Sequence, residues 1–207
     1  ILGWAFDFLQ RDGDGDPDER TWLRDETGGS VYLRLTTQPL EQPGKRCDDG
    51  FRQGSIDGAY WLREPGPNCS VVIAYQGAVA AEAIAAAGIA GEHRRDIGVL
   101  AVTSADRLAA GWTAAQRARA RGNANAQSHV ERLLSPLPAS CSLVTVLDGH
   151  PATLAWLGSV AGHRTIAHGV EHFGQTGTIP DLLRHFGIDR QSLVASISGL
   201  TPGRQIR

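Results

Sequence analysis

Four apolar runs of strand length constrain the fold of this chain more than any other feature. They span residues 69–75, 97–104, 143–148 and 164–170. Such runs are typical of strands that are covered on both faces of a sheet. Because segments with a helical pattern separate them, their order predicts a mainly parallel sheet with right-handed crossovers. The expected fold class is therefore α/β, with a three-layer sheet flanked by helices.

Helix and edge-strand signals complete this arrangement. The alanine-rich segment 77–90 predicts a helix after the first run, and Thr103 or Ser104 is the expected cap of the helix after the second. Further expected elements are an edge strand at 59–63 and helices at 151–161 and 189–197.

The amino-terminal part of the chain has a different character. Residues 1–11 predict an apolar helix, and the β-branched run 31–37 predicts a strand. Residues 38–52 are rich in Pro, Gly and charge, which is typical of a linker. The chain contains no Met, even at position 1, and its first residues already read as a helix without a cap. We therefore expect a piece of a longer protein.

The most informative single segment is 169–189, which reads as a strand end, a glycine-rich turn and a short helix. Gly174 and Gly177 permit backbone angles that other residues resist, and Thr178 can cap the helix. Pro180 and Asp181 suit its first turn, Leu182, Leu183 and Phe186 form an apolar stripe, and Gly187 ends it. Turns at this position in open α/β sheets present groups to ligands, although a well-capped surface turn is an equally simple interpretation.

Composition narrows the classes of function. The formal net charge of −2 and the pI near 6.4 argue against a nucleic-acid or anionic-membrane surface. No apolar run approaches the roughly 20 residues of a membrane span, and a basic secretory leader is absent. Cys47, Cys69 and Cys141 fit neither a disulfide framework nor a zinc motif. The expected compartment is the cytoplasm.

Several familiar motifs are missing or incomplete. The sequence has no Gly-x-Ser-x-Gly elbow, phosphate loop or Gly-x-Gly-x-x-Gly turn. The acidic loop 12–19 is similar to a calcium loop, but Pro17 and Leu23 stand where that loop needs glycine and glutamate. A solvated acidic turn is the better interpretation.

The candidate chemistry lies in histidines and arginines. His163, His168 and His172 are close in sequence, and a metal site with Glu171 or Asp148 would require their side chains to converge, which strand alternation opposes. Buried or hydrogen-bonded histidines are the simpler expectation. His172 with Glu171 is a possible acid/base pair, but no partner nucleophile accompanies it.

Two arginine features have ordinary explanations as well. Arg34, within an apolar run, is suited to an anionic substrate group, and a salt bridge is the alternative. The arginines at 117, 119 and 121 are expected on the solvated face of a helix.

The order of several segments resembles the carboxyl-terminal part of the transketolase-like enzymes that use thiamine diphosphate. The likeness is nearest to the homodimeric bacterial first component of the pyruvate dehydrogenase complex. The segments that carry it are 28–35, 50–60, 99–104 with Leu108, 169–174 and 184–186. Together they cover nearly the whole chain.

This resemblance implies a division of the chain. Residues 1–40 would be the tail of the pyrimidine-binding α/β domain, 41–58 a linker, and 59–207 the transketolase carboxyl-terminal-like domain. The resemblance implies thiamine diphosphate and magnesium in the full-length enzyme, with neither cofactor-binding, metal nor catalytic residues in this part. Arg34, His172 and Gln175 are the implied candidates for the substrate entrance.

The implied activity is that of a thiamine diphosphate-dependent 2-oxo acid dehydrogenase, acetyl-transferring, with pyruvate as substrate. Its implied partners are a second copy in a homodimer, the remaining domains of the parent enzyme and a lipoyl acyltransferase, with no nucleic acid and no membrane. Two alternatives stay open. One is a transketolase acting on sugar phosphates, for which Arg34 would bind phosphate, and the other is a non-catalytic dimerisation module.

Overall fold

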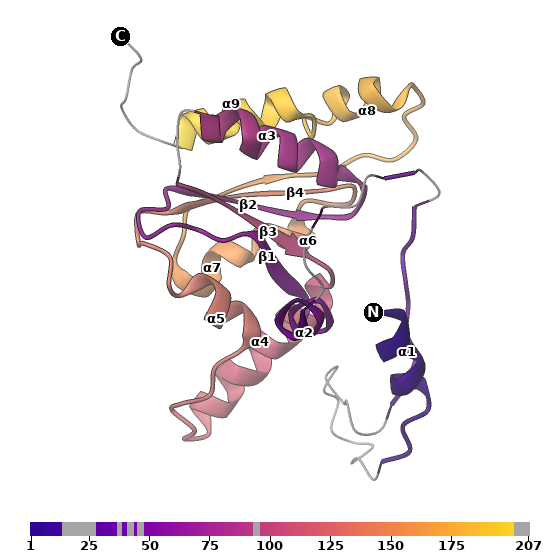
Figure 1. Ribbon diagram of the computed structural model, residues 1–207, viewed down its shortest axis with the longest axis vertical. Helices are drawn as coiled ribbons and strands as arrows, with labels where there is room; N and C mark the ends of the chain where they lie inside the picture. Colours follow the sequence, from indigo (N-terminus) through magenta and orange to yellow (C-terminus); the bar gives the residue numbers. More distant parts are fainter. Residues whose placement is uncertain (14–27, 37–38, 41–43, 45–47, 93–95, 201–207) are drawn as a thin grey trace.

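A five-stranded sheet with strand order β1-β3-β2-β4-β5 forms the centre of the computed structural model (Figure 1). The model describes residues 1–13, 28–36, 39–40, 44, 48–92 and 96–200. The strands are β1 (Ala59–Arg63), β2 (Val71–Gln76), β3 (Ile97–Val102), β4 (Ser142–Leu147) and β5 (Thr165–His168). β2, β3, β4 and β5 run parallel, and β1 pairs antiparallel with β3 at the edge. The predicted fold class and edge strand are confirmed.

Helices cover both faces of this sheet (Figure 1). α3 (Ala80–Glu92) and α9 (Arg190–Leu200) lie on one face, with α8 (Ile179–His185) beside them. The other face carries α4 (Ala105–Ala120), α5 (His129–Leu134), α6 (Ala152–Ala155) and α7 (Leu157–Ala161). The remaining helices are α1 (Leu2–Leu9), α2 (Asp49–Asp57) and the short 3-10 turn η1 (Gly77–Val79). Among the described helices, none is both long and apolar enough to cross a bilayer.

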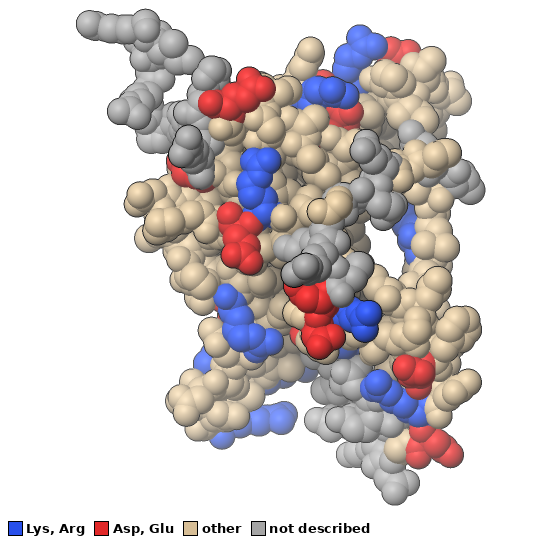
Figure 2. All heavy atoms as spheres, viewed as in Figure 1, with Lys and Arg blue, Asp and Glu red and all other residues tan. Residues whose placement is uncertain are grey.

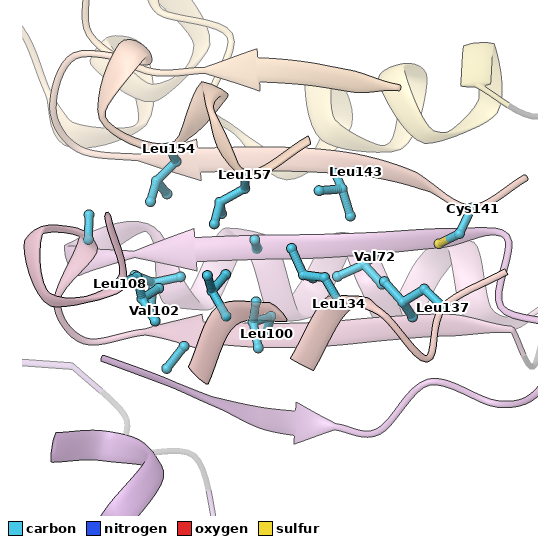
Figure 3. Close-up of a cluster of buried hydrophobic side chains, with 14 of the residues drawn as sticks. Val72, Leu100, Val102, Leu108, Leu134, Leu137, Cys141, Leu143, Leu154 and Leu157 are labelled. Carbon is cyan, nitrogen blue, oxygen red and sulfur yellow. The ribbon is translucent and has the colours of Figure 1, made fainter. Parts of the chain in front are cut away.

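The core consists of two layers because alternate residues of each strand point to opposite faces. Val71, Ile73 and Tyr75 of β2 pack with α3 and α9, while Val72 and Ala74 pack toward the other helices. Figure 3 shows the second layer, in which Leu100, Leu143, Leu154 and Leu157 are completely buried. This two-sided burial explains the apolar runs from which the sheet was predicted.

Local chemistry fixes the beginning of α4. The Ser104 side chain caps the helix by accepting a hydrogen bond from the Arg107 amide, as predicted. Gly58 has φ +112°, and its carbonyl accepts from the amides of Thr103 and Ser104. A Cβ at Gly58 would lie 2.7 Å from the Ser104 carbonyl oxygen, so only glycine fits this close approach.

The structure differs from the sequence prediction in three places. Residues 31–36 form no strand, because β-branched residues form a strand only beside a partner and these pair with none of the five strands. The second half of the expected linker is α2, which Asp48 caps and whose Phe51 packs on Tyr60 of β1. The expected helix 151–161 is divided at Trp156 into α6 and α7.

One helix was not predicted, and some predictions concern residues that the structure does not describe. α5 was not predicted, although Ser128 and Glu131 form a complete capping box at its start. The acidic segment 14–19, Cys47 and Thr37 lie outside the described residues.

A pair of leucine substitutions tests the two-layer core. Leu100→Ala removes a fully buried side chain from β3, and we expect the free energy of unfolding to fall by about 2–5 kcal/mol. Leu35→Ala truncates a side chain that is 80% exposed, and its effect should stay within about 0.5 kcal/mol. Urea unfolding followed by circular dichroism measures both, and equal losses would contradict the observed burial.

Candidate functional site

The candidate site lies at the carboxyl ends of β2, β4 and β5. β3 and β4 flank β2 on opposite sides, so the chain direction across the sheet reverses at β2. Open α/β sheets bind ligands outside the carboxyl ends of their strands at such a point. Gly77 follows β2, Asp148 and Gly149 follow β4, and 169–172 follow β5.

Two glycines allow these loops to approach one another. Gly77 has φ +82°, and any Cβ there would collide with the Asp148 carboxylate. A Cβ at Gly169 would collide with the Gly149 carbonyl and come within 2.8 Å of the Pro151 nitrogen. The Val170 amide donates to the Gly149 carbonyl over 2.8 Å. The three loops therefore form one continuous polar edge.

Arg34 reaches this edge from the amino-terminal segment. Its Nη1 and Nη2 atoms each lie 3.1 Å from a carboxylate oxygen of Asp148, and Nη2 also donates to the Asp148 carbonyl. The salt bridge that the sequence left open as an alternative is thus the observed arrangement. The Arg34 side chain remains 60% exposed, so this ion pair contributes at most about 1 kcal/mol.

A cavity of about 250 Å³ opens at the end of β5. Its lining is Ala167, His168, Gly169, Glu171, His172, His185 and Phe186. Three imidazoles and one carboxylate supply hydrogen-bond donors and acceptors there, so the cavity suits a small polar ligand or a proton transfer. His172, a predicted entrance residue, belongs to this lining, whereas Gln175 lies exposed in the turn that follows.

The pKa of His168 in this cavity is shifted from its ordinary value. Burial lowers its pKa, while a backbone group of Gly187 and the carboxylate of Asp189 act in the opposite direction. His168 Nε2 shares a hydrogen bond with Ser196 Oγ over 2.8 Å. The ring is therefore held between β5 and α9.

Of the three histidines singled out from the sequence, His168 and His172 line the cavity and His163 does not. His163 is buried away from the cavity, and its ring nitrogens face the carbonyls of Cys141 and Leu134. Within the described ranges, no group of three or more His, Cys, Asp or Glu side chains could hold a metal ion. Buried or hydrogen-bonded histidines, the simpler expectation, are what the structure contains at 163 and 168.

The described residues contain no cluster of three or more His, Cys, Asp or Glu side chains that could hold a metal ion such as magnesium. The polar edge contains a carboxylate already paired with Arg34 and a cavity lined mainly by imidazoles. We therefore assign no cofactor contact to these residues.

The sequence reasoning missed His185 as a site residue. His185 lies at the end of α8, and it lines the cavity because this end of α8 lies near the end of β5. The capping signals of α8 predicted the helix correctly, with Thr178 accepting from the Asp181 amide and Gly187 at φ +64°. Helix boundaries alone do not determine which strand end a helix covers.

Charge is distributed evenly over the face of the molecule in Figure 2. Acidic and basic side chains alternate there, and no continuous basic surface is visible on this face. Ion pairs of the described residues include Arg119 with Glu131 and Arg190 with Glu82. This face therefore lacks the electrostatic footprint of a nucleic-acid-binding surface.

Comparison with solved structures identifies the architecture. No protein-family model matches the sequence, and no curated protein matches it. A transketolase variant from Pichia stipitis superposes with a TM-score of 0.57 at 19% identity, covering 85% of this chain and 22% of that one. The fold is that of a transketolase-like α/β domain.

Two further solved structures share this fold. Transketolase from Leishmania mexicana has a TM-score of 0.52 at 21% identity over 72% of this chain and 18% of its own. Transketolase from Pichia stipitis in complex with sedoheptulose-7-phosphate has a TM-score of 0.50 at 18% identity over the same shares. The chain thus spans about a fifth of the length of the transketolases it matches. Identities this low establish the fold alone.

Asp148→Asn tests the ion pair that attaches the amino-terminal segment. The amide keeps the shape of the carboxylate beside Gly77 but removes its charge, so we expect trypsin to cleave several-fold faster after Arg34. The free energy of unfolding should fall by less than about 1 kcal/mol. Asp181→Asn is the matched control, because it neutralises an exposed carboxylate whose partners, Arg184 and Thr178, lie in or beside α8 and not at Arg34. Unchanged cleavage after Arg34 would contradict the attachment.

The lowered pKa of His168 predicts a pH dependence of stability. Since the unfolded state binds the proton more tightly, stability is complete above the ordinary histidine value of about 6.5 and declines as the pH falls below it. His168→Gln retains a hydrogen-bonding group and should flatten the decline between about pH 7 and pH 5. His150→Gln, at an exposed histidine, should leave the decline unchanged. Urea unfolding at several pH values measures the slopes, and an unchanged slope in His168→Gln would contradict the prediction.

Proposed function

We propose that this chain is the carboxyl-terminal part of a longer thiamine diphosphate enzyme of the transketolase-like family. The proposed reaction is the decarboxylation of a 2-oxo acid, pyruvate, with transfer of the acetyl unit to a lipoyl group on an acyltransferase partner. The observation that carries the proposal is the fold likeness to a transketolase, which covers 85% of this chain. The segments quoted above from the sequence supply the narrower assignment to the pyruvate dehydrogenase first component.

The proposed division places the pyrimidine-binding tail at 1–40, the linker at 41–58 and the transketolase carboxyl-terminal-like domain at 59–207. The arrangement in Figure 1 supports it, since α1 and the extended segment lie beside the sheet rather than in its layers. Two contacts join this part to the sheet domain: Arg34 pairs with Asp148, and the Arg107 guanidinium lies 4.9 Å from the Trp4 ring centre. α2 attaches the end of the linker to β1.

Exposed apolar side chains in the amino-terminal part support a missing partner surface. Trp4 stacks on Phe8, which half-buries both rings, but the opposite side of α1 faces solvent. The exposed large apolar residues of this part are Ile1, Leu2, Phe6, Leu9, Tyr32, Leu33 and Leu35. Apolar groups of this kind are typical of protein interfaces. We propose that the rest of the pyrimidine-binding domain and the second copy of a homodimer cover them.

The proposed role of this part is to shape the substrate entrance. In this proposal the other domains of the longer enzyme hold the cofactor. An imidazole such as that of His172 can donate a hydrogen bond to the carboxylate of a 2-oxo acid and orient it. Gln175, three residues further along the same exposed turn, is the second proposed entrance residue, and Arg34 is the third.

A transketolase acting on sugar phosphates is the second candidate. The neighbours in structure are transketolases, and one was solved with a sugar phosphate. Against it, both terminal guanidinium nitrogens of Arg34 already engage Asp148, so a phosphate at this position would have to displace a carboxylate. The third candidate, a non-catalytic dimerisation module, predicts no activity in any longer polypeptide.

An assay of the longer polypeptide tests the proposal. With thiamine diphosphate and magnesium, we expect pyruvate-dependent reduction of an artificial electron acceptor. His172→Ala should lower kcat/KM for pyruvate by about tenfold, corresponding to about 1.4 kcal/mol of transition-state stabilisation. Gln175→Ala should lower it less, and Gln116→Ala, an exposed glutamine on α4, is the matched control without effect.

Each alternative outcome is distinct. Turnover of a ketose phosphate without turnover of pyruvate would establish the transketolase reaction and contradict the oxo-acid assignment. Activity with neither substrate would contradict both enzyme assignments. For residues 1–207 alone, calorimetric titration with thiamine diphosphate should give no heat, and micromolar binding would contradict the partial-enzyme proposal.

A further inference from the structure

Two buried thiols lie close together at the amino ends of β2 and β4. The candidate site lies at the opposite, carboxyl ends of these strands. Cys69 lies two residues before β2 and Cys141 directly precedes β4. Their Sγ atoms are 3.9 Å apart, and each residue is only 1% exposed. Sequence reasoning did not pair them, because 72 positions separate them along the chain.

Strand register explains why they meet. In the parallel pair β2 and β4, Val71 lies opposite Ser142, and the Ser142 amide donates to the Ser70 carbonyl. Both thiols belong to the same core layer as Val72 and Leu143, and Figure 3 shows the Cys141 side chain at that end of the layer. The thiols therefore share one pocket of the core rather than opposite faces of the sheet.

Hydrogen bonding gives the two thiols different pKa values. The Cys141 thiol donates toward Cys69 Sγ, and the Cys69 thiol donates to the Val71 carbonyl over 3.3 Å. The bond from Cys141 lowers the pKa of Cys69, although burial opposes this, while the same bond and burial raise the pKa of Cys141. Cys69 is thus the better nucleophile, and Cys141 stands beside it as a protonated neighbour.

We propose that Cys69 and Cys141 form a peroxide-sensitive redox pair that closes to an intramolecular disulfide between β2 and β4. The sulfurs must approach by roughly 1.9 Å to reach the bond length of about 2.0 Å. Cys69 follows the turn at Gly66, whose carbonyl accepts from the Cys69 amide, and the next residues of that turn, Pro67 and Asn68, are exposed. The proposal requires this turn to open far enough to admit hydrogen peroxide.

The chemistry balances in two steps. The Cys69 thiolate attacks one oxygen of hydrogen peroxide, the O–O bond breaks, and a sulfenic acid and hydroxide form. Cys141 sulfur then attacks the Cys69 sulfur, the S–O bond breaks, and the thiol proton leaves with the hydroxyl as water. Two thiols are oxidised by two electrons in total, and one peroxide is reduced. The buried neighbour competes with further oxidation of the sulfenic acid because it is already in contact.

The disulfide would tighten the centre of the sheet. It would close a loop that contains α3, β3, α4 and α5 and would tie β2, where the strand order reverses, to β4. Closing a loop of this length stabilises the native state chiefly by restricting the unfolded chain. We expect the midpoint of thermal unfolding to rise by about 5–15 °C on oxidation and to return after reduction with dithiothreitol.

The experiment uses the chain with Cys47→Ser, which leaves Cys69 and Cys141 as its only cysteines. After treatment of the folded protein with hydrogen peroxide, remaining thiols are alkylated under denaturing conditions, and the digested protein is analysed by mass spectrometry. The expected result is a peptide pair linked through Cys69 and Cys141, two hydrogens lighter than the thiols, with the unfolding midpoint raised. Cys141→Ser should instead leave a sulfenic acid at Cys69 that a dimedone probe captures.

Other outcomes would overturn the inference. They are full alkylation of both thiols after peroxide treatment, conversion of Cys69 to sulfinic acid without a linked peptide, or links between separate chains. Should Cys141→Ser fail to fold, the Cys47→Ser protein still tests the proposed disulfide. Its readouts are the linked peptide and the reversible shift of the thermal unfolding midpoint. The candidate site lies at the other edge of the sheet, so the outcome is independent of the proposed enzyme activity.

Discussion

Parallel pairing of β2 with both β3 and β4 is the constraint on which the rest of the structure depends. It buries β2 on both faces, and it leaves room for helices only above and below the sheet. Because parallel neighbours require crossover connections, the intervening segments must form α3, α4 and α5. The same pairing places the carboxyl ends of three parallel strands together on one edge. It brings the two cysteines together on the other.

The two edges of the sheet consequently differ in chemistry. At the carboxyl edge, glycines at 77 and 169 permit loops to touch, and charged groups such as Arg34 and Asp148 meet at the surface. At the amino edge, thiols are enclosed in the core. An exposed polar edge suits binding and proton transfer, whereas an enclosed pair of thiols suits a change of covalent state. The proposed entrance role and the proposed redox pair follow from this separation.

Many elements followed from local sequence because the forces that form them are local or periodic. The apolar runs predicted β2, β3 and β4, and the capping residues Ser104 and Thr178 predicted where α4 and α8 begin. The prediction of a strand from the apolar run at 31–36 was wrong, since a strand also requires a partner strand with free backbone groups. Of the predicted site residues, His172 lines the cavity and Arg34 reaches Asp148. His163 stays apart from this cavity, as strand alternation predicted, because its ring is buried near Cys141 and Leu134.

The sequence by itself determined the fold class, the edge strand and the main helices, because hydrophobic periodicity and capping act over a few residues. Tertiary structure alone decided that the end of α8 lies near the end of β5 and that His185 lines the cavity there. It also decided that Asp148 holds Arg34 across 114 positions and that Cys69 meets Cys141 across 72. Contacts of this kind depend on strand register and on the paths of loops. These are properties of the whole packed chain rather than of any segment.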